Sequence, residues 1–389
     1  MKIAVIGVKG IPAKQWEIER YCQEFYPRIA ERGHQVDLFI RPEYHQQPWF
    51  SVYYYNNIRA IALASIPGKK FNLLLNFALD TIWATFGNYD VIHIQGIDAA
   101  WFCWFPYLFS RAKIIVTSYQ LECRRHKWRK AFGWLLRWIE TTAINNTDEI
   151  VVVSRTLGEY LQKKYHIRPR YIPYAPRSYP KTDPEFTYGK TLGLEPKKYL
   201  LYVGDLTSEH QPDLLLKAFE RIEKGWKLII AGNIDTSVQY AIELLAIAMS
   251  RQDIIFTNKI TGQHLAEIVK NAGLLVVPSG SIELRLPSTM LEAMREGVPV
   301  VANDTKIHRE LLGKNRGLLF QSGELDSLTT KIQYALNQPQ AMSAMTQRAQ
   351  TYIAFQHNWD RVTYGNLSLY LKLTSPVLTQ PMKYRVWDN

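Results

Sequence analysis

Short apolar runs alternate with amphipathic stretches along most of the chain, starting at the N-terminus. In the first half, the pattern predicts strands at Lys2–Gly7, Gln35–Ile40, Ile58–Leu63, Val91–Ile94, Lys113–Thr117, Glu149–Val153 and Arg170–Pro173. It predicts helices between them at Trp16–Arg32, Leu73–Phe86, Ala99–Phe109, Lys130–Ile144 and Arg155–Tyr165. Because strands that alternate with helices form parallel sheets, we expect a doubly wound α/β domain here.

The second half repeats this alternation. Its predicted strands are Tyr199–Val203, Lys227–Ala231, Asp253–Phe256, Leu274–Val277, Pro299–Val301 and Gly317–Phe320. Its predicted helices are Gln211–Ile222, Ser237–Ser250, Gly262–Asn271, Ser288–Glu296, Ile307–Leu312, Leu325–Ala335, Ala341–Phe355 and Trp359–Leu371. The fold class expected from the whole pattern is α/β, with two Rossmann-like domains that face each other across a ligand cleft.

A proline-rich stretch without clear periodicity separates the two halves. It contains Pro173, Pro176, Pro180, Pro184 and Pro196. We therefore predict an N-terminal domain over residues 1–176, a linker over 177–196 and a C-terminal domain over 197–355. A C-terminal helix over 356–372 and a tail over 373–389 follow.

Composition narrows the class of protein. The chain has 389 residues, 47% of them hydrophobic, and a formal net charge of +12, which favours an anionic partner such as a nucleotide-sugar, a membrane surface or nucleic acid. Its three cysteines lie far apart, which argues against a disulfide framework or a zinc site. No signal peptide or run of about 18 apolar residues is found, so the expected location is the cytoplasm.

One candidate site is the segment from Pro278 to Asp304, PSGSIELRLPSTMLEAMREGVPVVAND. It reads as a strand end, a polar loop, a short helix and the next strand. Pro287 suits the start of that helix, because a proline needs no backbone N–H there. A helix N-terminus after a strand is a ready anion site, and Glu292 one turn inside could accept hydrogen bonds from sugar hydroxyls.

This segment resembles the donor-nucleotide loop of family 4 glycosyltransferases (glycosyl transferase group 1), which have the GT-B fold. Those enzymes carry two glutamates with seven residues between them, whereas Glu283 and Glu292 have eight between them. The resemblance implies that Glu292 binds the ribose. It also implies that Glu283 and the backbone amides around Leu286, Pro287 and Ser288 form the part of the site that faces the donor sugar and phosphates.

The loop after the first strand, GVKGIPA, resembles the rhamnosyltransferase-like branch of the family. Glycines such as Gly10 let the backbone approach a ligand, although a tight turn would explain them equally well. The family also has two glycines ahead of Glu19, and this chain has Trp16 and Glu17 there. An indole and a carboxylate at those positions would crowd and repel a diphosphate.

Three further positions depart from the family pattern. Tyr119 stands where the family has the histidine beside the donor sugar, and a tyrosine can donate a hydrogen bond but is a poor base near neutral pH. After Gly204, Asp205 and His210 replace the arginine and lysine that neutralise the diphosphate. Arg285 is the nearest replacement for those lost cations. His93 is expected either at the cleft rim or as a hydrogen-bonded structural residue.

A basic segment follows Tyr119. It contains Arg124, Arg125, His126, Lys127, Arg129 and Lys130, with aromatic residues at Trp101–Phe109 upstream. This pattern suits peripheral contact with an anionic membrane that carries a lipid-linked acceptor. A solvated charged face beside a core helix explains it as well. No nucleic-acid-binding module is recognisable, so no nucleic acid is expected.

The resemblance implies transfer of a sugar from a nucleotide-diphosphate sugar to a saccharide or lipid-linked acceptor, with retention, in the synthesis of a cell-surface polysaccharide or glycan. It implies a nucleotide-binding C-terminal domain, an acceptor-binding N-terminal domain, no metal and no further cofactor. The alternative is a catalytically inactive GT-B relative that acts as a partner or saccharide-binding subunit of an active glycosyltransferase. The changes at Trp16, Glu17, Tyr119, Asp205 and His210 favour that alternative.

Overall fold

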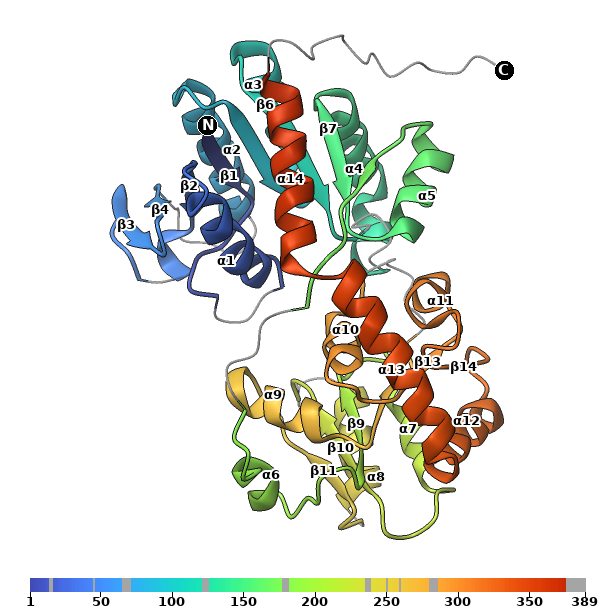
Figure 1. The fold of residues 1–389 in the computed structure, drawn as a ribbon. Coiled ribbons are helices and arrows are strands. Elements are labelled where there is room, and N and C mark those ends of the chain that lie inside the picture. Colours follow the sequence, from blue (N-terminus) through green and yellow to red (C-terminus); the bar gives the residue numbers. More distant parts are fainter. Residues whose placement is uncertain are drawn as a thin grey trace. The chain divides into compact units, whose positions relative to one another are not determined.

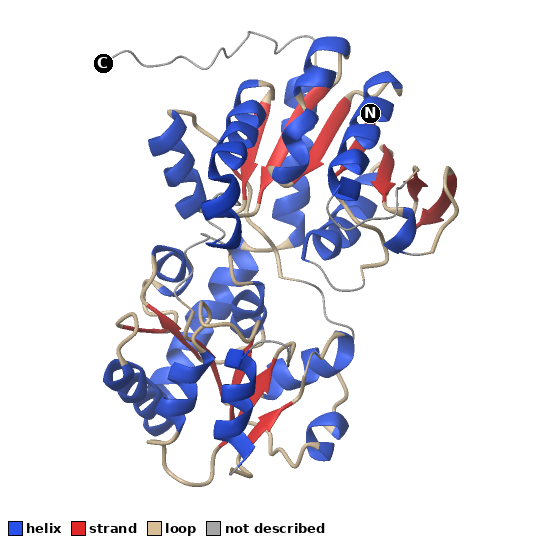
Figure 2. Cartoon of the chain, turned by 180° about the vertical axis from the view of Figure 1, so that it is seen from behind, coloured by secondary structure: helices blue, strands red, loops and turns tan. Residues whose placement is uncertain are grey.

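The computed structural model describes residues 1–13, 17–44, 46–64, 71–120, 126–176, 182–234, 239–249, 251–258, 260–279 and 286–375. These residues form two compact units, each with one central sheet and helices on both of its faces (Figures 1 and 2). The first unit holds Met1–Ala175, Ile282–Leu286 and Asn358–Asn389, and the second holds Pro176–Ser281 and Pro287–His357, as far as these ranges are described. The α/β class predicted from the sequence is confirmed.

The first unit contains an eight-stranded sheet. Its strands are β1 (Lys2–Ile6), β2 (Gln35–Ile40), β3 (Ser51–Tyr55), β4 (Ile58–Ala62), β5 (Val91–Gln95), β6 (Lys113–Ser118), β7 (Glu149–Val152) and β8 (Arg170–Tyr171). Their order is β3-β4-β2-β1-β5-β6-β7-β8, and the pairings are parallel except between β3 and β4. The sequence pattern does not predict β3, an edge strand that joins β4 through Asn56 and Asn57, both at positive φ.

Helices cover both faces of this sheet. They are α1 (Glu17–Ala30), α2 (Phe71–Phe86), α3 (Trp104–Phe109), α4 (His126–Asn145), α5 (Arg155–Tyr165) and α14 (Trp359–Thr374), with short 3-10 turns η1 (Pro42–Tyr44) and η2 (Asp98–Phe102). Alternate strand residues such as Ala4, Ile92 and Ile114 pack against α2, η2 and α4 in one core cluster. The residues between them point to the opposite face, because side chains alternate along a strand.

The single helix predicted over Ala99–Phe109 is wrong, because the structure divides this range between η2 and α3. Pro106 supplies the physical reason. A proline deep inside one continuous helix would remove a backbone hydrogen bond and clash with the preceding turn. Starting α3 at Trp104 keeps Pro106 within the first turn, where its missing N–H is not needed.

Helix α14, which ends the described chain, belongs to the first unit. It packs against α1 and β6 and so lies beside elements from the start of the chain (red against blue in Figure 1). Tyr370 of α14 is fully buried, as is Asn366. The first unit therefore needs the two ends of the described sequence to complete its core.

The second unit contains a six-stranded sheet, parallel throughout. Its strands are β9 (Tyr199–Val203), β10 (Lys227–Ala231), β11 (Ile254–Phe256), β12 (Leu274–Val277), β13 (Val300–Asn303) and β14 (Leu318–Phe320), in the order β11-β10-β9-β12-β13-β14. Its helices are α6 (Thr187–Thr191), α7 (Pro212–Phe219), α8 (Gln239–Met249), α9 (Gly262–Asn271), α10 (Ser288–Arg295), α11 (Lys306–Leu312), α12 (Leu325–Asn337) and α13 (Pro339–Gln356). Leu200, Leu228 and Val276 lie in its core cluster.

Helix α6 lies within the range predicted as a linker. It is held to α9, because the backbone N–H of Gly189 donates to Glu267 at 3.0 Å and the ring of Tyr188 stacks on His264 at 4.0 Å. The sequence pattern does not predict this helix, which has only five residues. The boundaries of the functional domains stay a prediction.

Candidate functional site

The sheet of the second unit has a topological switch point at β9. This strand pairs with β10 on one side and with β12 on the other, so the chain leaves β9 toward one side of the sheet and later returns on the other. Ligands of open α/β sheets bind outside the carboxyl ends of the strands at such a point. The pairing of Leu200 with Leu274 places Gly204, after β9, next to Pro278, after β12.

The backbone is tightly packed at this edge. The N–H of Gly204 donates to the carbonyl of Ala231 at 3.1 Å, and a Cβ on Gly232 would lie only 2.1 Å from the carbonyl oxygen of Gly204. Only a glycine fits at position 232 without moving the loop after β9. The predicted site residue Gly204 is half-buried and lies at the switch point.

The N-terminus of α10 is the second part of this site. Pro287 is its N-cap residue, with an extended backbone and no side-chain cap, while Leu286 before it is buried and Ser288 is half-buried. Glu292 lies one turn inside the helix and is only 2% exposed. Glu283 and Arg285 lie outside the described residues, so their predicted roles stay predictions.

The two residues that replace the family's cations lie in the loop after β9. Asp205 is exposed, and its backbone carbonyl accepts a hydrogen bond from the Tyr202 hydroxyl at 2.8 Å. His210 is half-buried, with its Nδ1 2.8 Å from the hydroxyl oxygen of Thr207. The exposed carboxylate of Asp205 therefore adds negative charge at the carboxyl edge of the sheet.

Two residues that the sequence did not single out are Asn303, which ends β13, and His308 of α11. Asn303 is fully buried, donates from Nδ2 to the carbonyl of Pro278 at 3.1 Å and has an Oδ1 atom without a hydrogen-bond partner. His308 donates from Nδ1 to the carbonyl of Asn303 at 2.7 Å, and burial lowers the pKa of His308 to about 4. The signal that could have found Asn303 is a polar residue directly after the apolar run Val300–Ala302.

The first unit has its own switch point at β1, between β2 and β5. Gly7 ends β1 with φ of 93°, and a Cβ there would lie 2.4 Å from the carbonyl oxygen of Gln95. Gly10, in the loop that follows, is buried. The same loop is fixed by Glu19, whose Oε1 accepts from the N–H of Lys9 at 3.0 Å. Trp16 lies outside the described residues, and Glu17 begins α1.

Glu19 is an acidic residue held in an unusual environment. It is 2% exposed, its Oε2 has no hydrogen-bond partner, and burial raises its pKa although the Lys9 amide opposes that shift. Such a carboxyl group can take up a proton more easily than an ordinary glutamate. It orients the backbone at the switch point of the first unit.

A buried chain of hydrogen bonds begins at Tyr119. The Tyr119 hydroxyl donates to Oε1 of Gln95 at 2.6 Å, and Nε2 of Gln95 donates to the Tyr26 hydroxyl at 2.6 Å. Tyr26 in turn lies 2.9 Å from Nδ1 of His93. The chain thus joins the end of β6 to the middle of β5.

His93 lies at the centre of this network. Its Nδ1 is 2.6 Å from the hydroxyl of Tyr370 on α14, and its Nε2 is 2.7 Å from the hydroxyl of Thr117 on β6. The residue is fully buried, and burial lowers its pKa to about 3. Of the two roles expected for His93, the structural one fits these contacts.

The network limits what Tyr119 can do chemically. Burial raises its pKa well above the usual value for tyrosine, so its hydroxyl stays protonated near neutral pH. The residue is half-buried and its hydroxyl donates its hydrogen to Gln95, so it cannot act as a general base.

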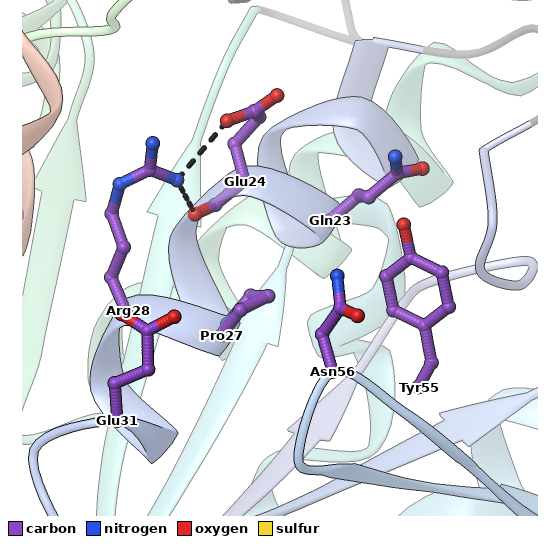
Figure 3. A pocket seen from close by; sticks show the side chains of 7 residues that line it. All are labelled: Gln23, Glu24, Pro27, Arg28, Glu31, Tyr55 and Asn56. Atoms are coloured by element: carbon purple, nitrogen blue, oxygen red, sulfur yellow. Dashed lines mark hydrogen bonds and ion pairs between the residues drawn. The ribbon is translucent and has the colours of Figure 1, made fainter.

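A polar pocket with a volume of about 350 Å³ lies elsewhere in the first unit (Figure 3). It is lined by Gln23, Glu24, Pro27, Arg28, Glu31, Tyr55 and Asn56. Arg28 and Glu24 form an ion pair of 3.0 Å on one wall, while Tyr55 ends β3 and Asn56 lies in the turn that precedes β4. This turn is at the amino end of β4, so the pocket lies away from the carboxyl edge where Gly7 ends β1.

The described part of the chain lacks two features that would point to other kinds of site. It contains no group of three or more His, Cys, Asp or Glu residues that could hold a metal ion. Its helices include none that is both long enough and apolar enough to cross a bilayer.

Comparison with known proteins identifies the protein family. A model of proteins described as "Glycosyltransferase Family 4" matches residues 18–177, and a model described as "Glycosyl transferases group 1" matches residues 187–352. The chain is 22% identical to an uncharacterized glycosyltransferase of Methanocaldococcus jannaschii, over 95% of this chain and 98% of that protein.

Solved structures agree with this finding at the level of the fold. Sucrose-phosphate synthase from Thermosynechococcus elongatus matches with a TM-score of 0.78 and 22% identity, over 96% of this chain and 98% of its own. Anabaena HepE in complex with UDP-glucose matches with a TM-score of 0.73 and 15% identity, over 95% and 99%. The predicted GT-B fold is confirmed. Since the two family models together span most of the sequence, the chain belongs to the family 4 (group 1) glycosyltransferases with the GT-B fold.

Proposed function

We propose that this glycosyltransferase moves a sugar from a nucleotide-diphosphate sugar to a hydroxyl group of a saccharide or lipid-linked acceptor, with retention. The observation that carries the proposal is the carboxyl edge of the second unit's sheet. There the switch point at Gly204, the close packing at Gly232 and the N-terminus of α10 lie at neighbouring strand ends. Backbone N–H groups at such an edge suit a diphosphate.

Individual residues have proposed roles in this site. Glu292 would bind the ribose, and Glu283 would face the donor sugar. Gly204, Leu286, Pro287 and Ser288 would line the phosphate site, with Arg285 supplying positive charge. A leaving diphosphate needs such charge, because stabilising developing charge is the main work of a transfer site.

The first unit would then bind the acceptor. Two residues of the first unit have roles proposed toward the donor instead. Gly10 would lie where the backbone approaches the nucleotide-sugar, and Tyr119 would have a catalytic role beside the donor sugar as a protonated hydroxyl rather than as a base. The motif GVKGIPA supports assignment to the rhamnosyltransferase-like branch and to the synthesis of a cell-surface polysaccharide or glycan at the cytoplasmic side of the membrane. The basic segment Arg124–Lys130, of which residues 124 and 125 lie outside the described residues, would contact that membrane.

Nucleotide binding tests the donor site directly. Anabaena HepE has been solved in complex with UDP-glucose, so UDP is the first probe and GDP the second. A site with a Kd near 10 µM should add about 2.7 kcal/mol to the free energy of unfolding at 1 mM ligand, measured as a rise in melting temperature. Arg285→Ala should reduce this rise.

Lys224→Ala is the matched control. It removes the same charge from an exposed position at the amino end of β10, the opposite edge of the sheet, and should leave the rise unchanged. No rise with any nucleoside diphosphate would overturn the proposal. That result would instead support an inactive relative that serves as a partner or saccharide-binding subunit, which the exposed carboxylate of Asp205 favours.

A further inference from the structure

Helix α2 of the first unit exposes apolar side chains to solvent. Its sequence, FNLLLNFALDTIWATF, contains one ionisable residue, Asp80, which is 5% exposed. The buried side of the helix includes Asn76, Asp80, Thr81 and Thr85. The exposed side instead carries Ile82, Trp83 and Phe86, with Phe86 67% exposed. Phe77 and Ala84 of the same helix are buried as well, but an apolar exposed side departs from the usual pattern of a helix on the surface of a water-soluble domain.

Helix α3 continues the same kind of surface. It consists of WFPYLF and has no charged residue. Trp104, Tyr107, Leu108 and Phe109 are all exposed, Leu108 and Phe109 by 64% and 60%. Four exposed large apolar side chains on one helix of six residues need an explanation, because isolated ones are normal but grouped ones mark an interaction site.

Helix α4 adds two tryptophans. Trp134 and Trp138 are 68% and 48% exposed and lie four residues apart, on one face of the helix. Exposed Arg137 lies beside them. Lys127, Arg129 and Lys130 lie in the first two turns of the same helix.

Ring contacts connect these helices. Phe86 of α2 lies 6.1 Å from Phe105 of α3, and Phe105 lies 4.9 Å from Phe109. Trp101 of η2 lies 5.9 Å from Trp138 of α4. We call the resulting set the aromatic surface, defined by Ile82, Trp83, Phe86, Trp104, Tyr107, Leu108, Phe109, Trp134 and Trp138. It is built on the helix layer that covers one face of the sheet of the first unit.

Two exposed arginines lie near the aromatic surface. Arg111, just after α3, and Arg137 are exposed. None of the exposed side chains described in α2, α3 and α4 is a carboxylate, and Glu140 of α4 is buried and paired with Lys164 at 2.9 Å. An apolar surface rich in Trp, Tyr and Phe with exposed arginines beside it complements the interface of an anionic bilayer.

We propose that the aromatic surface inserts into the interfacial region of an anionic membrane and holds the first unit there. Tryptophan and tyrosine are suited to that depth, because one end of the side chain is apolar and the other polar. The proposal rests on the proposed function in one respect: membrane binding would bring the enzyme to a lipid-linked acceptor. It adds to the basic segment an apolar contribution, carried largely by α2 and α3.

Vesicle binding of the full-length protein tests the proposal. The protein should co-sediment with vesicles of phosphatidylcholine that contain 30 mol% phosphatidylglycerol and bind pure phosphatidylcholine much more weakly. The variant W83A/F86A/L108A/F109A should reduce the partition coefficient on the anionic vesicles by about tenfold or more, because it removes four side chains from the membrane-facing side. Lipids brominated near the headgroup should quench the tryptophan fluorescence of the wild-type protein.

Tyr364→Ala is the matched control, since Tyr364 is 75% exposed but lies on α14, which packs with α1 rather than with the helices that carry the aromatic surface. It should bind vesicles as the wild type does. Melting temperature and the UDP-induced rise should be the same in all three proteins, so loss of membrane binding is separable from failure of the donor site. Unchanged partitioning of the quadruple variant would overturn the proposal. A second result would also overturn the proposal. In it the wild type binds no vesicles but self-associates, and the quadruple variant no longer self-associates.

Discussion

At the scale of single residues, burial shifts the pKa values of two ionisable groups of the first unit, and each shift keeps its group uncharged near neutral pH. It raises the pKa of Asp80 to about 8 and lowers that of His93 to about 3. His93 has hydroxyl partners at both ring nitrogens, whereas Arg41 only partly opposes the shift of Asp80. The two groups therefore make stability depend on pH in opposite directions.

Replacing Asp80 with asparagine should remove part of that pH dependence. Between about pH 4 and pH 8, folded Asp80 binds a proton that the unfolded chain has lost, so the free energy of unfolding falls by about 1.4 kcal/mol for each pH unit gained. Asp80→Asn should therefore become more stable than the wild type as pH rises from 5 to 8. Urea unfolding at four pH values measures this difference.

Asp360→Asn is the control, since Asp360 is exposed in the first turn of α14. Its difference from the wild type should stay constant over the same pH range. A constant difference for Asp80→Asn would contradict the expectation.

At the scale of elements, strand order determines which loops meet. Gly204, Pro278 and Asn303 are far apart in sequence, and each directly follows or ends one of three adjacent parallel strands, β9, β12 and β13. The hydrogen bond from Asn303 to the Pro278 carbonyl fixes two of these ends. The charge at this edge then depends on the loop after β9, which carries Asp205 and His210.

Restoring the family's cations in that loop should strengthen nucleotide binding. The double variant D205R/H210K replaces a carboxylate and an imidazole with two groups that can donate charge-assisted hydrogen bonds to phosphate oxygens. Each such bond is worth about 1.5–3 kcal/mol, so the Kd for UDP or GDP in isothermal titration should fall by about tenfold or more.

Glu223→Arg serves as the control for the charge change made by Asp205→Arg, because Glu223 is exposed on the connection that leads into the amino end of β10. It should leave the Kd nearly unchanged. Equal effects of the two changes would mean that general electrostatic attraction, and no local contact, is responsible.

At the scale of the whole molecule, the two units differ in which parts of the sequence form them. The second unit is formed by described residues between 176 and 357, while the first unit needs α14 from the end of the sequence. Tyr370 of α14 reaches His93, and the Asn366 amide donates to the Tyr21 hydroxyl at 3.4 Å. The buried network of the first unit is therefore completed only after the second unit has been synthesised.

Deleting residues 358–389 should destabilise the first unit selectively. The deletion removes the Tyr370 hydroxyl beside His93 and the Asn366 amide that donates to the Tyr21 hydroxyl, and each lost partner of a buried polar group costs about 1–3 kcal/mol. Hydrogen exchange should show lost amide protection in β1, β5 and β6 and retained protection in β9 and β12. A chain that ends at Ser375 should behave as the wild type, and a uniform loss of protection across both units would contradict this expectation.

The sequence by itself determined the two alternating α/β blocks, because buried parallel strands require continuous apolar runs that amphipathic helices separate. Several predicted bounds, such as those of β9, β12 and α9, agree with the structure residue by residue. The sequence pattern does not predict the edge strand β3, although Val52–Tyr55 are residue types that favour strands, and the structure leaves its residues alternately half-buried and exposed.

Only the tertiary structure decided which side chains meet. The sequence places His93 and Tyr370 277 residues apart, yet a hydrogen bond joins them. It likewise gives no indication that α2 buries Asp80 and exposes Trp83, because the periodicity of a helix that is apolar on both faces does not say which face meets the core. Local pattern specifies the elements, whereas burial and side-chain contact depend on neighbours that folding brings from distant parts of the chain.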